Sequence, residues 1–174
     1  MARTNPIATY KDYTLKAVIV APELLNSRLI AQGFKFIREE NQHDFYFQVS
    51  KGKLKFRKGS HNNLITHYER ILLQRTERTI VYRYDENPTE EEIDELFSKN
   101  KLIGEVQKKR KHYQLDNVFV HLDELFNGEK FIEIEAKDFE NRYSEDQLKK
   151  QCHTVFERLG LRQYDAIKTG YFNS

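Results

Sequence analysis

Residues 53–57 read Lys53-Leu54-Lys55-Phe56-Arg57, so cationic and apolar side chains alternate at every position. A period of two residues is typical of a β-strand, whose successive side chains point to opposite faces. The three cations then share one face and lie about 7 Å apart. Like charges at that separation repel by about 2 kcal/mol at an effective dielectric of about 20. The stretch therefore predicts a strand with one apolar face and one cationic face that needs water or an anion.

The same two-residue period recurs along most of the chain. Short connections such as Lys51-Gly52 and Asn127-Gly128 are typical of antiparallel neighbours. With residues 53–57 included, we expect about seven or eight strands. The other alternating segments are residues 12–20, 44–49, 65–72, 78–84, 105–113, 118–122 and 131–136.

Three segments have the spacing and end signals of helices. Residues 22–32 begin with Pro22 and are followed by Gly33, and residues 88–99 carry acidic side chains in their first turn. Ser144 is placed to cap a third helix that ends before Gly160. Each segment carries an apolar stripe, which we expect to pack in the core.

The composition indicates one domain over residues 1–174 that folds in a reducing compartment. The single cysteine, Cys152, excludes an intramolecular disulfide framework. No stretch approaches the roughly 18 apolar residues of a membrane span, and the first residues lack the apolar core of a signal peptide. We therefore expect a cytoplasmic protein without a membrane contact. The 29 basic and 27 acidic residues nearly balance, which argues against a nucleic-acid partner.

Charges of one sign gather on single strand faces elsewhere too. Lys108 and Arg110 share a face, and Lys16 lies on the polar face of residues 12–20. Glu133 and Glu135 lie opposite two isoleucines on another strand. An antiparallel sheet often leaves one face in water, and charge on such a face needs no further explanation. If the sheet closes, however, its apolar outside is covered by the helices and its inside becomes a charged channel for a polyanion or a divalent metal.

Six short stretches in this order resemble the CYTH superfamily, the triphosphate tunnel proteins that include class IV adenylyl cyclases, thiamine triphosphatases and inorganic triphosphatases. The similarity is greatest to the class IV cyclase branch and runs from about Lys16 to Tyr171. Gln42-His43-Asp44-Phe45-Tyr46-Phe47 is similar to that branch's Gln-x-Asp-x-Tyr-Phe. The other stretches are Leu54–Arg57, Tyr68–Arg70, Val106–Tyr113, Val120–Leu125 and Phe131–Glu135.

The resemblance implies an α+β fold, a closed or nearly closed eight-stranded antiparallel β tunnel flanked by about three helices. It implies that the tunnel binds a nucleotide or other organic triphosphate, and that carboxylates hold Mg²⁺ or Mn²⁺. Carried over by position, Glu133 and Glu135 become metal ligands and, with Lys108 and Arg110, catalytic residues. The implied substrate-binding residues are Lys16, Lys55, Arg57, Arg70, Lys108 and Arg110.

One position departs from the family pattern. The family's Glu-x-Glu-x-Lys aligns with Asp12-Tyr13-Thr14-Leu15-Lys16, so threonine replaces the second glutamate. A neutral hydroxyl cannot supply the charge that a carboxylate gives a metal ion.

Three functions therefore remain open. The first is a metal-dependent enzyme, either adenylyl cyclase-like or a triphosphatase. The second is a module that binds a nucleotide or phosphorylated ligand with weakened catalysis. The third is a phosphodiesterase or lyase that acts on a nucleotide-derived signal. A homodimer is compatible with all three. The histidines lack the spacing of a zinc site, although His121 shares a strand face with Asp123 and could transfer a proton there.

Overall fold

The computed structural model describes residues 5–73, 76–162 and 166–167. Tyr171, the far end of the family resemblance, lies outside these residues. The helices are the 3-10 turn η1 (Pro22–Leu24), α1 (Leu25–Ala31), α2 (Glu90–Lys99) and α3 (Glu145–Arg158). The strands are β1 (Ala8–Val18), β2 (Lys35–Phe47), β3 (Lys53–Gly59), β4 (Asn63–Leu73), β5 (Thr76–Glu86), β6 (Leu102–Leu115), β7 (Val118–Leu125), β8 (Lys130–Asp138) and β9 (Ala166–Ile167).

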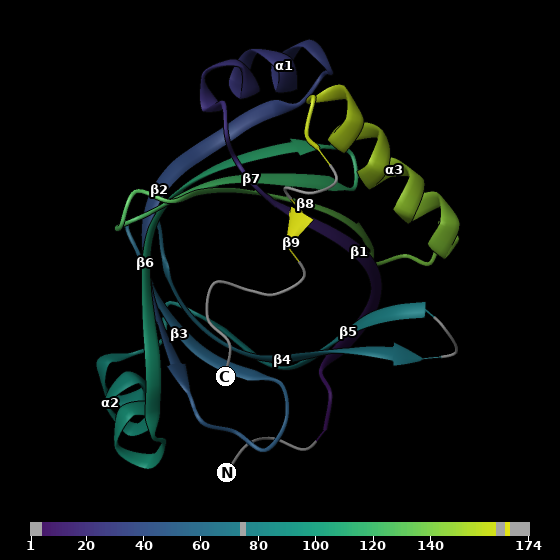
Figure 1. The fold of residues 1–174 in the computed structure, drawn as a ribbon. Helices are drawn as coiled ribbons and strands as arrows, with labels where there is room; N and C mark the ends of the chain where they lie inside the picture. Colours follow the sequence, from purple (N-terminus) through teal and green to yellow (C-terminus); the bar gives the residue numbers. More distant parts are fainter. Residues whose placement is uncertain (1–4, 74–75, 163–165, 168–174) are drawn as a thin grey trace. The chain divides into compact units, whose positions relative to one another are not determined.

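Hydrogen bonding joins these strands into one sheet. Its order is β5-β4-β3-β2-β6-β7-β8-β1-β9, and β5 also pairs with β1. This additional pairing joins the two ends of the run from β5 to β1, so eight strands form a closed antiparallel sheet. The predicted α+β class, with eight closing strands and three α-helices, is confirmed (Figure 1).

The chain divides into two compact units, each assembled from separate stretches of sequence. The described part of the first unit comprises residues 5–9, 40–73 and 76–107. That of the second unit comprises residues 10–39, 108–162 and 166–167. β1, β2 and β6 each contribute residues to both units.

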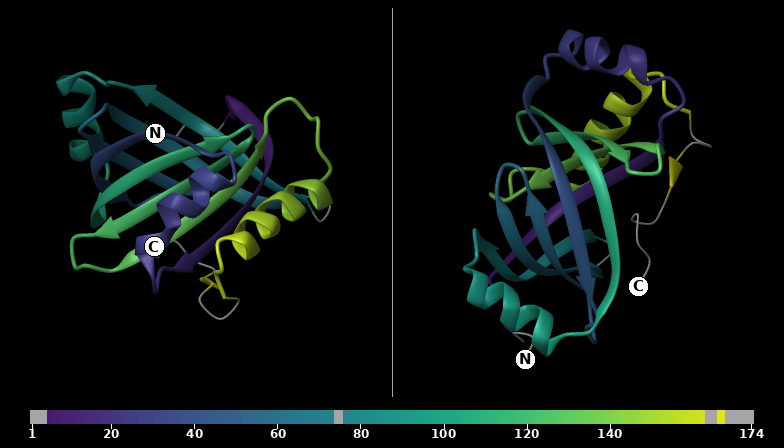
Figure 2. Two further views of the ribbon diagram at one scale, coloured as in Figure 1. Left: turned by 90° about the horizontal axis from the view of Figure 1, so that it is seen from above. Right: turned by 90° about the vertical axis from the view of Figure 1, so that its left-hand side faces the viewer.

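The second unit has its core between helices α1 and α3 and one face of its strands. The register pairs Leu15 with Ile134 and Ala17 with Ile132 across β1 and β8. These side chains pack with Leu148 of α3 and with other apolar residues of α1 and α3. Figure 2 shows both helices lying along this face. The apolar face predicted for residues 12–20 is therefore confirmed.

The first unit packs the apolar face of β3 against α2. Leu54 and Phe56 are buried with Phe47, Ile65 and the α2 residue Leu96. The alternation of residues 53–57 thus separates a buried apolar face from a charged one, as predicted. Within the described ranges, none of the helices has the length and apolar character of a membrane span.

Helix boundaries follow the capping residues. Thr89 and Ser144 each form a capping box, accepting a hydrogen bond from the backbone N–H three residues later. α2 therefore begins at Glu90, two residues after the predicted start, whereas the start predicted for α3 is confirmed. The predicted helix 22–32 begins as the 3-10 turn η1, with Pro22 at its first position, and continues as α1 to Ala31.

One long strand was predicted only in part, and one short strand was not predicted. β2 begins at Lys35 rather than at residue 44, and its buried side chains in the missed part, Glu40 and Gln42, are polar. β9 was not expected, and it pairs two residues with β1.

Candidate functional site

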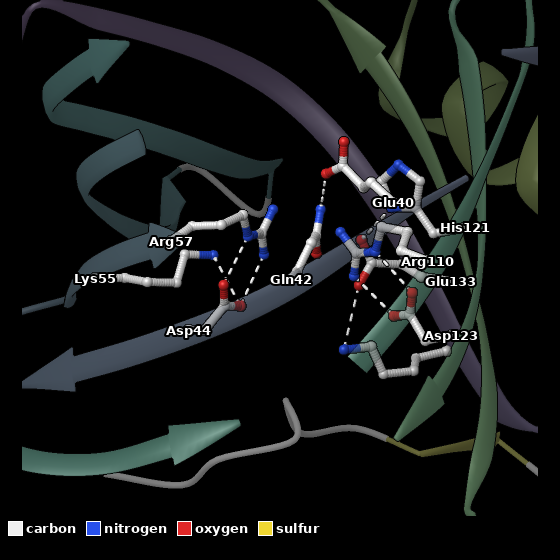
Figure 3. A network of polar contacts seen from close by, with 10 residues as sticks. Glu40, Gln42, Asp44, Lys55, Arg57, Arg110, His121, Asp123 and Glu133 are labelled. Atoms are coloured by element: carbon white, nitrogen blue, oxygen red, sulfur yellow. Dashed lines mark hydrogen bonds and ion pairs between the residues drawn. The ribbon is translucent and has the colours of Figure 1, made fainter. Parts of the chain in front are cut away.

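In the first unit, β2 and β3 bring an aspartate, a lysine and an arginine together. Asp44 lies directly opposite Arg57 in the strand register. Its two carboxylate oxygens accept hydrogen bonds from Arg57 Nε at 2.7 Å and Nη2 at 2.8 Å. Lys55 Nζ lies 3.9 Å from the same carboxylate. The Asp44 side chain is fully buried, and Figure 3 shows the three side chains converging.

Aromatic and polar residues continue this charged face. Lys55 Nζ lies 6.0 Å from the ring centre of Tyr46 and 5.8 Å from that of Tyr68. Gln42, also buried, donates a hydrogen bond to Glu40 through its side-chain amide. Arg70 lies two residues beyond Tyr68 on β4 and is exposed. The structure thus brings Lys55 and Arg57 together and places Arg70 further along the sheet.

A cavity of about 620 Å³ lies beside the turn between β2 and β3. Tyr46, Lys51, Lys53 and Lys101 contribute to its lining, and the lining residues that the structure describes include no carboxylate. Because Lys53 precedes Lys55 on the same face of β3, the cavity adjoins the charged face of the first unit. Sequence patterning alone gave no sign of this hollow.

The second unit contains a matching pair on β6 and β7. Arg110 and Asp123 lie opposite each other in the register. Arg110 Nε and Nη2 each donate to one Asp123 oxygen at 2.7 Å. Burial tends to raise the pKa of the Asp123 carboxyl, but the charge of Arg110, its hydrogen bonds and the nearby Lys108 outweigh burial and lower this pKa to about 2. Lys108 and Arg110 are themselves buried.

Glu133 on β8 lies between two basic side chains. Its Oε2 is 3.2 Å from Lys16 Nζ on β1, and its Oε1 is 3.6 Å from His121 Nδ1 on β7. The second distance is too long for a hydrogen bond. Burial would raise the pKa of Glu133, but His121, Lys16 and Arg110 together hold this pKa well below its usual range. Burial and the charge of Arg110 lower the pKa of His121.

Glu135 faces the residue that departs from the family pattern. The register places Thr14 opposite Glu135 and Lys16 opposite Glu133. Glu135 is 5% exposed and its Oε1 lies 3.7 Å from Lys137 Nζ. The buried Asp12 comes two residues before Thr14 and lies opposite Lys137. Threonine therefore stands at the place on β1 where a third carboxylate would meet the two glutamates.

The carboxylates and other potential ligands of the second unit differ in how well they suit a divalent metal ion. Among the described residues, no three or more side chains of the histidine, cysteine, aspartate and glutamate types are grouped to hold an ion. Glu133 and Glu135 nevertheless alternate on one face of β8 and supply carboxylate oxygens, which Mg²⁺ and Mn²⁺ prefer. Mg²⁺ commonly uses one or two carboxylates together with substrate phosphates. The residues present therefore fit an ion that shares its ligands with a bound phosphate chain.

The alternation of charged residues in the sequence indicates the cations and glutamates of these faces but not their partners. Asp44 and Asp123 appeared in the family motifs, without a role, and the structure pairs each with an arginine. The signal lay in the strand register, which pairs residues across a hairpin. The sequence suggested His121 as a proton-transfer group. In the structure His121 lies beside Glu133, but the distance of 3.6 Å between His121 Nδ1 and Glu133 Oε1 is too long for a hydrogen bond.

The protein is therefore a closed antiparallel sheet whose polar strand faces carry lysines, arginines paired with aspartates, and glutamates. Residues 12–171 match the family model of the CYTH domain. The chain therefore belongs to the CYTH family, which confirms the resemblance seen in its motifs.

Solved structures share this fold over nearly the whole chain. The PH1012 protein of Pyrococcus horikoshii is 27% identical, with a TM-score of 0.76, and the match covers 92% of this chain and 96% of that protein. A conserved hypothetical protein of Pyrococcus furiosus is 24% identical, with a TM-score of 0.75 and coverage of 92% and 97%. A candidate adenylate cyclase of Vibrio parahaemolyticus is 12% identical, with a TM-score of 0.73 and coverage of 92% and 95%. A comparison with curated protein sequences finds no significant match.

Proposed function

We propose that this chain is a metal-dependent enzyme that acts on the phosphate chain of a nucleotide or another organic triphosphate. The observation that carries the proposal is the set of buried cations beside buried carboxylates on the polar strand faces of a CYTH fold. Guanidinium groups bind phosphate oxygens through paired hydrogen bonds, and ammonium groups bind them as point charges. The proposed phosphate ligands are Lys16, Lys55, Arg57, Arg70, Lys108 and Arg110.

In this proposal the protein contributes position and charge rather than covalent chemistry. Phosphoryl transfer depends mainly on alignment and on neutralisation of the charge that develops on the phosphate oxygens. The lysines and arginines would hold the phosphate chain and offset its negative charge. Glu133 and Glu135 would hold Mg²⁺ or Mn²⁺, and a bound ion polarises the phosphate group that it contacts. Glu133 suits this task because its lowered pKa keeps it ionised at neutral pH.

The experiment is a substrate panel with ATP, GTP, thiamine triphosphate and inorganic tripolyphosphate, each with Mg²⁺ or Mn²⁺, resolved by phosphorus NMR. Release of pyrophosphate with a cyclic nucleotide would identify a cyclase, and release of terminal phosphate would identify a triphosphatase. We expect Glu133→Ala and Glu135→Ala to lose turnover and keep the fold. Glu124→Ala is the matched control, because Glu124 is exposed on the opposite face of β7. Inertness of the unaltered protein towards the whole panel would refute the enzyme proposal.

A second candidate is a module that binds triphosphates without efficient turnover. Thr14 favours this candidate, because it offers Glu135 a neutral hydroxyl where a carboxylate would complete a set of three. Such a module should retain measurable nucleotide affinity in the presence of a chelator. Metal-dependent turnover of the bound nucleotide would argue for the enzyme instead.

A further inference from the structure

The described residues of each unit contain the same arrangement of three side chains. One copy consists of Asp44 on β2 with Lys55 and Arg57 on β3, and we call it the first clamp. The second clamp consists of Asp123 on β7 with Lys108 and Arg110 on β6. In both clamps the lysine and the arginine alternate on one strand, and the aspartate lies directly opposite the arginine.

The two clamps also agree in atomic detail. In each, the arginine uses Nε and Nη2 to grip both carboxylate oxygens, at 2.7 and 2.8 Å in the first clamp and at 2.7 Å for both contacts in the second. Both aspartate side chains have a relative exposure of 0%. The lysine charge reaches the aspartate too, at 3.9 Å in the first clamp and through its field in the second.

This geometry fixes the orientation of the guanidinium group, and the three side chains of each clamp together keep a positive charge. A guanidinium group carries five N–H donors in one plane, and the fork to aspartate engages two of them. The fork therefore sets the orientation of the remaining three. With one lysine, one arginine and one aspartate, each clamp keeps a formal charge of +1. A buried ion pair that only joined two strands would need no alternating lysine beside it.

We propose that Asp44 and Asp123 are positioning residues, which hold Arg57 and Arg110 in the plane that a phosphoryl group requires. This inference rests on the proposed function, since the arginines are its phosphate ligands. A side chain already held in its binding orientation loses less freedom when the ligand arrives. The aspartates then strengthen the binding of an anion although they carry negative charge themselves.

The proposal gives affinity an unusual sign. If charge alone decided, Asp44→Asn and Asp123→Asn would bind tripolyphosphate more tightly, because each removes a negative charge. If the aspartates position the arginines, both variants bind it more weakly, by at least about fivefold or 1 kcal/mol. We expect Asp44→Glu, which restores a carboxylate, to recover part of this loss. In an Arg57→Lys background Asp44→Asn should add little, because the fork is already lost.

The experiment is calorimetric titration of tripolyphosphate into the full chain, with each variant's fold checked by circular dichroism. Asp138→Asn is the matched control: Asp138 is also buried and pairs with Lys11 at 3.2 Å, but it lies on the opposite face of β8. We expect this control to bind as the unaltered protein does. Equal or tighter binding by both folded asparagine variants would overturn the positioning role and leave the proposed function standing. An unaltered protein that does not bind would remove the proposed function and the clamps with it.

A second measurement does not require the variants to fold. In the unaltered, ligand-free protein, the Nε–H groups of Arg57 and Arg110 should give nitrogen-15 order parameters near those of rigid backbone, about 0.85. Exposed Arg158, in the last turn of α3, is the reference for a mobile arginine. If Arg57 and Arg110 are as mobile as Arg158, the arginines are not held in place and the inference is wrong.

Discussion

Thr14 is a neutral residue at a position where the family pattern has a carboxylate that could bind a metal ion. It lies opposite Glu135 on β1, so a carboxylate there would join two others on the facing strand. We predict that Thr14→Glu lowers the Mn²⁺ concentration needed for half-maximal turnover several-fold, because a third charged oxygen ligand strengthens binding of a hard cation. Direct titration with Mn²⁺ measures the same change without turnover.

Thr14→Gln is the control for that experiment, because it has the length of glutamate without the charge. Only the glutamate variant should gain Mn²⁺ affinity. Equal affinity in both variants would mean that the missing carboxylate is not what limits metal binding at this place.

Asp123 gives the fold a dependence on acid. Its pKa is lowered from 3.8 to about 2 in the folded protein, where Arg110 outweighs the opposing effect of burial. A carboxyl group with a lowered folded pKa stabilises the fold above its unfolded pKa, and this stabilisation is lost as the pH falls towards the folded value. We therefore expect about 2 kcal/mol of stability to disappear between roughly pH 4 and pH 2.

Urea unfolding at a series of pH values tests this expectation. Asp123→Asn should be less stable at neutral pH, because it leaves Arg110 without its charged partner, and its stability should fall less steeply in acid. Asp94→Asn, at an exposed position on α2, serves as the control. Parallel curves for Asp123→Asn and the unaltered protein would contradict the assignment.

The strands differ in how clearly their sequences show the two-residue period of a β-strand. In β3 every second residue is charged and the others are apolar, so the period is visible and both faces were predicted correctly. The missed half of β2 also alternates, since Glu40, Gln42 and Asp44 are buried while Glu39 and Asn41 are exposed. Its buried residues are polar, however, so hydrophobicity carries no trace of the period. A strand segment with polar side chains on both faces cannot be recognised from hydrophobic periodicity.

The turn between β2 and β3 depends on Gly52. Its φ is +71°, and a Cβ there would overlap the backbone carbonyl oxygen of Tyr68. Gly128 also has a positive φ, +90°, but a Cβ there would meet nothing within 4 Å. Substitution of Gly128 would therefore cause backbone strain alone, whereas substitution of Gly52 would cause backbone strain and a steric overlap.

We predict that Gly128→Ala costs about 1–2 kcal/mol of unfolding free energy, the usual penalty for a left-handed alanine. Gly52→Ala should lower the free energy of unfolding by a further ~1–3 kcal/mol, because the strand must also move away from the new methyl group. Denaturant unfolding of both variants measures the difference. Equal costs would show that the approach of Tyr68 is not restrictive.

For the molecule as a whole, the motifs were sufficient to identify the family and the charged residues, but not the arrangement of those residues. Local alternation assigns a side chain to a face, and the positions of Lys55, Arg57, Lys108 and Arg110 followed from it. The pairing of each arginine with an aspartate thirteen residues away depends on strand register. Register is set by the turn and by the neighbouring strand, so it emerges only when the sheet has formed.

Calorimetric titration of inorganic tripolyphosphate in the presence of a chelator measures whether these charged faces bind a triphosphate. We expect saturable binding that weakens as the salt concentration rises. Lys55→Ala and Lys16→Ala should each bind at least tenfold more weakly, by about 1.4 kcal/mol, and Lys149→Ala, on the exposed side of α3, should bind as the unaltered protein does. No saturable binding by the unaltered protein, or equal binding by all three variants, would show that these faces are not a triphosphate site.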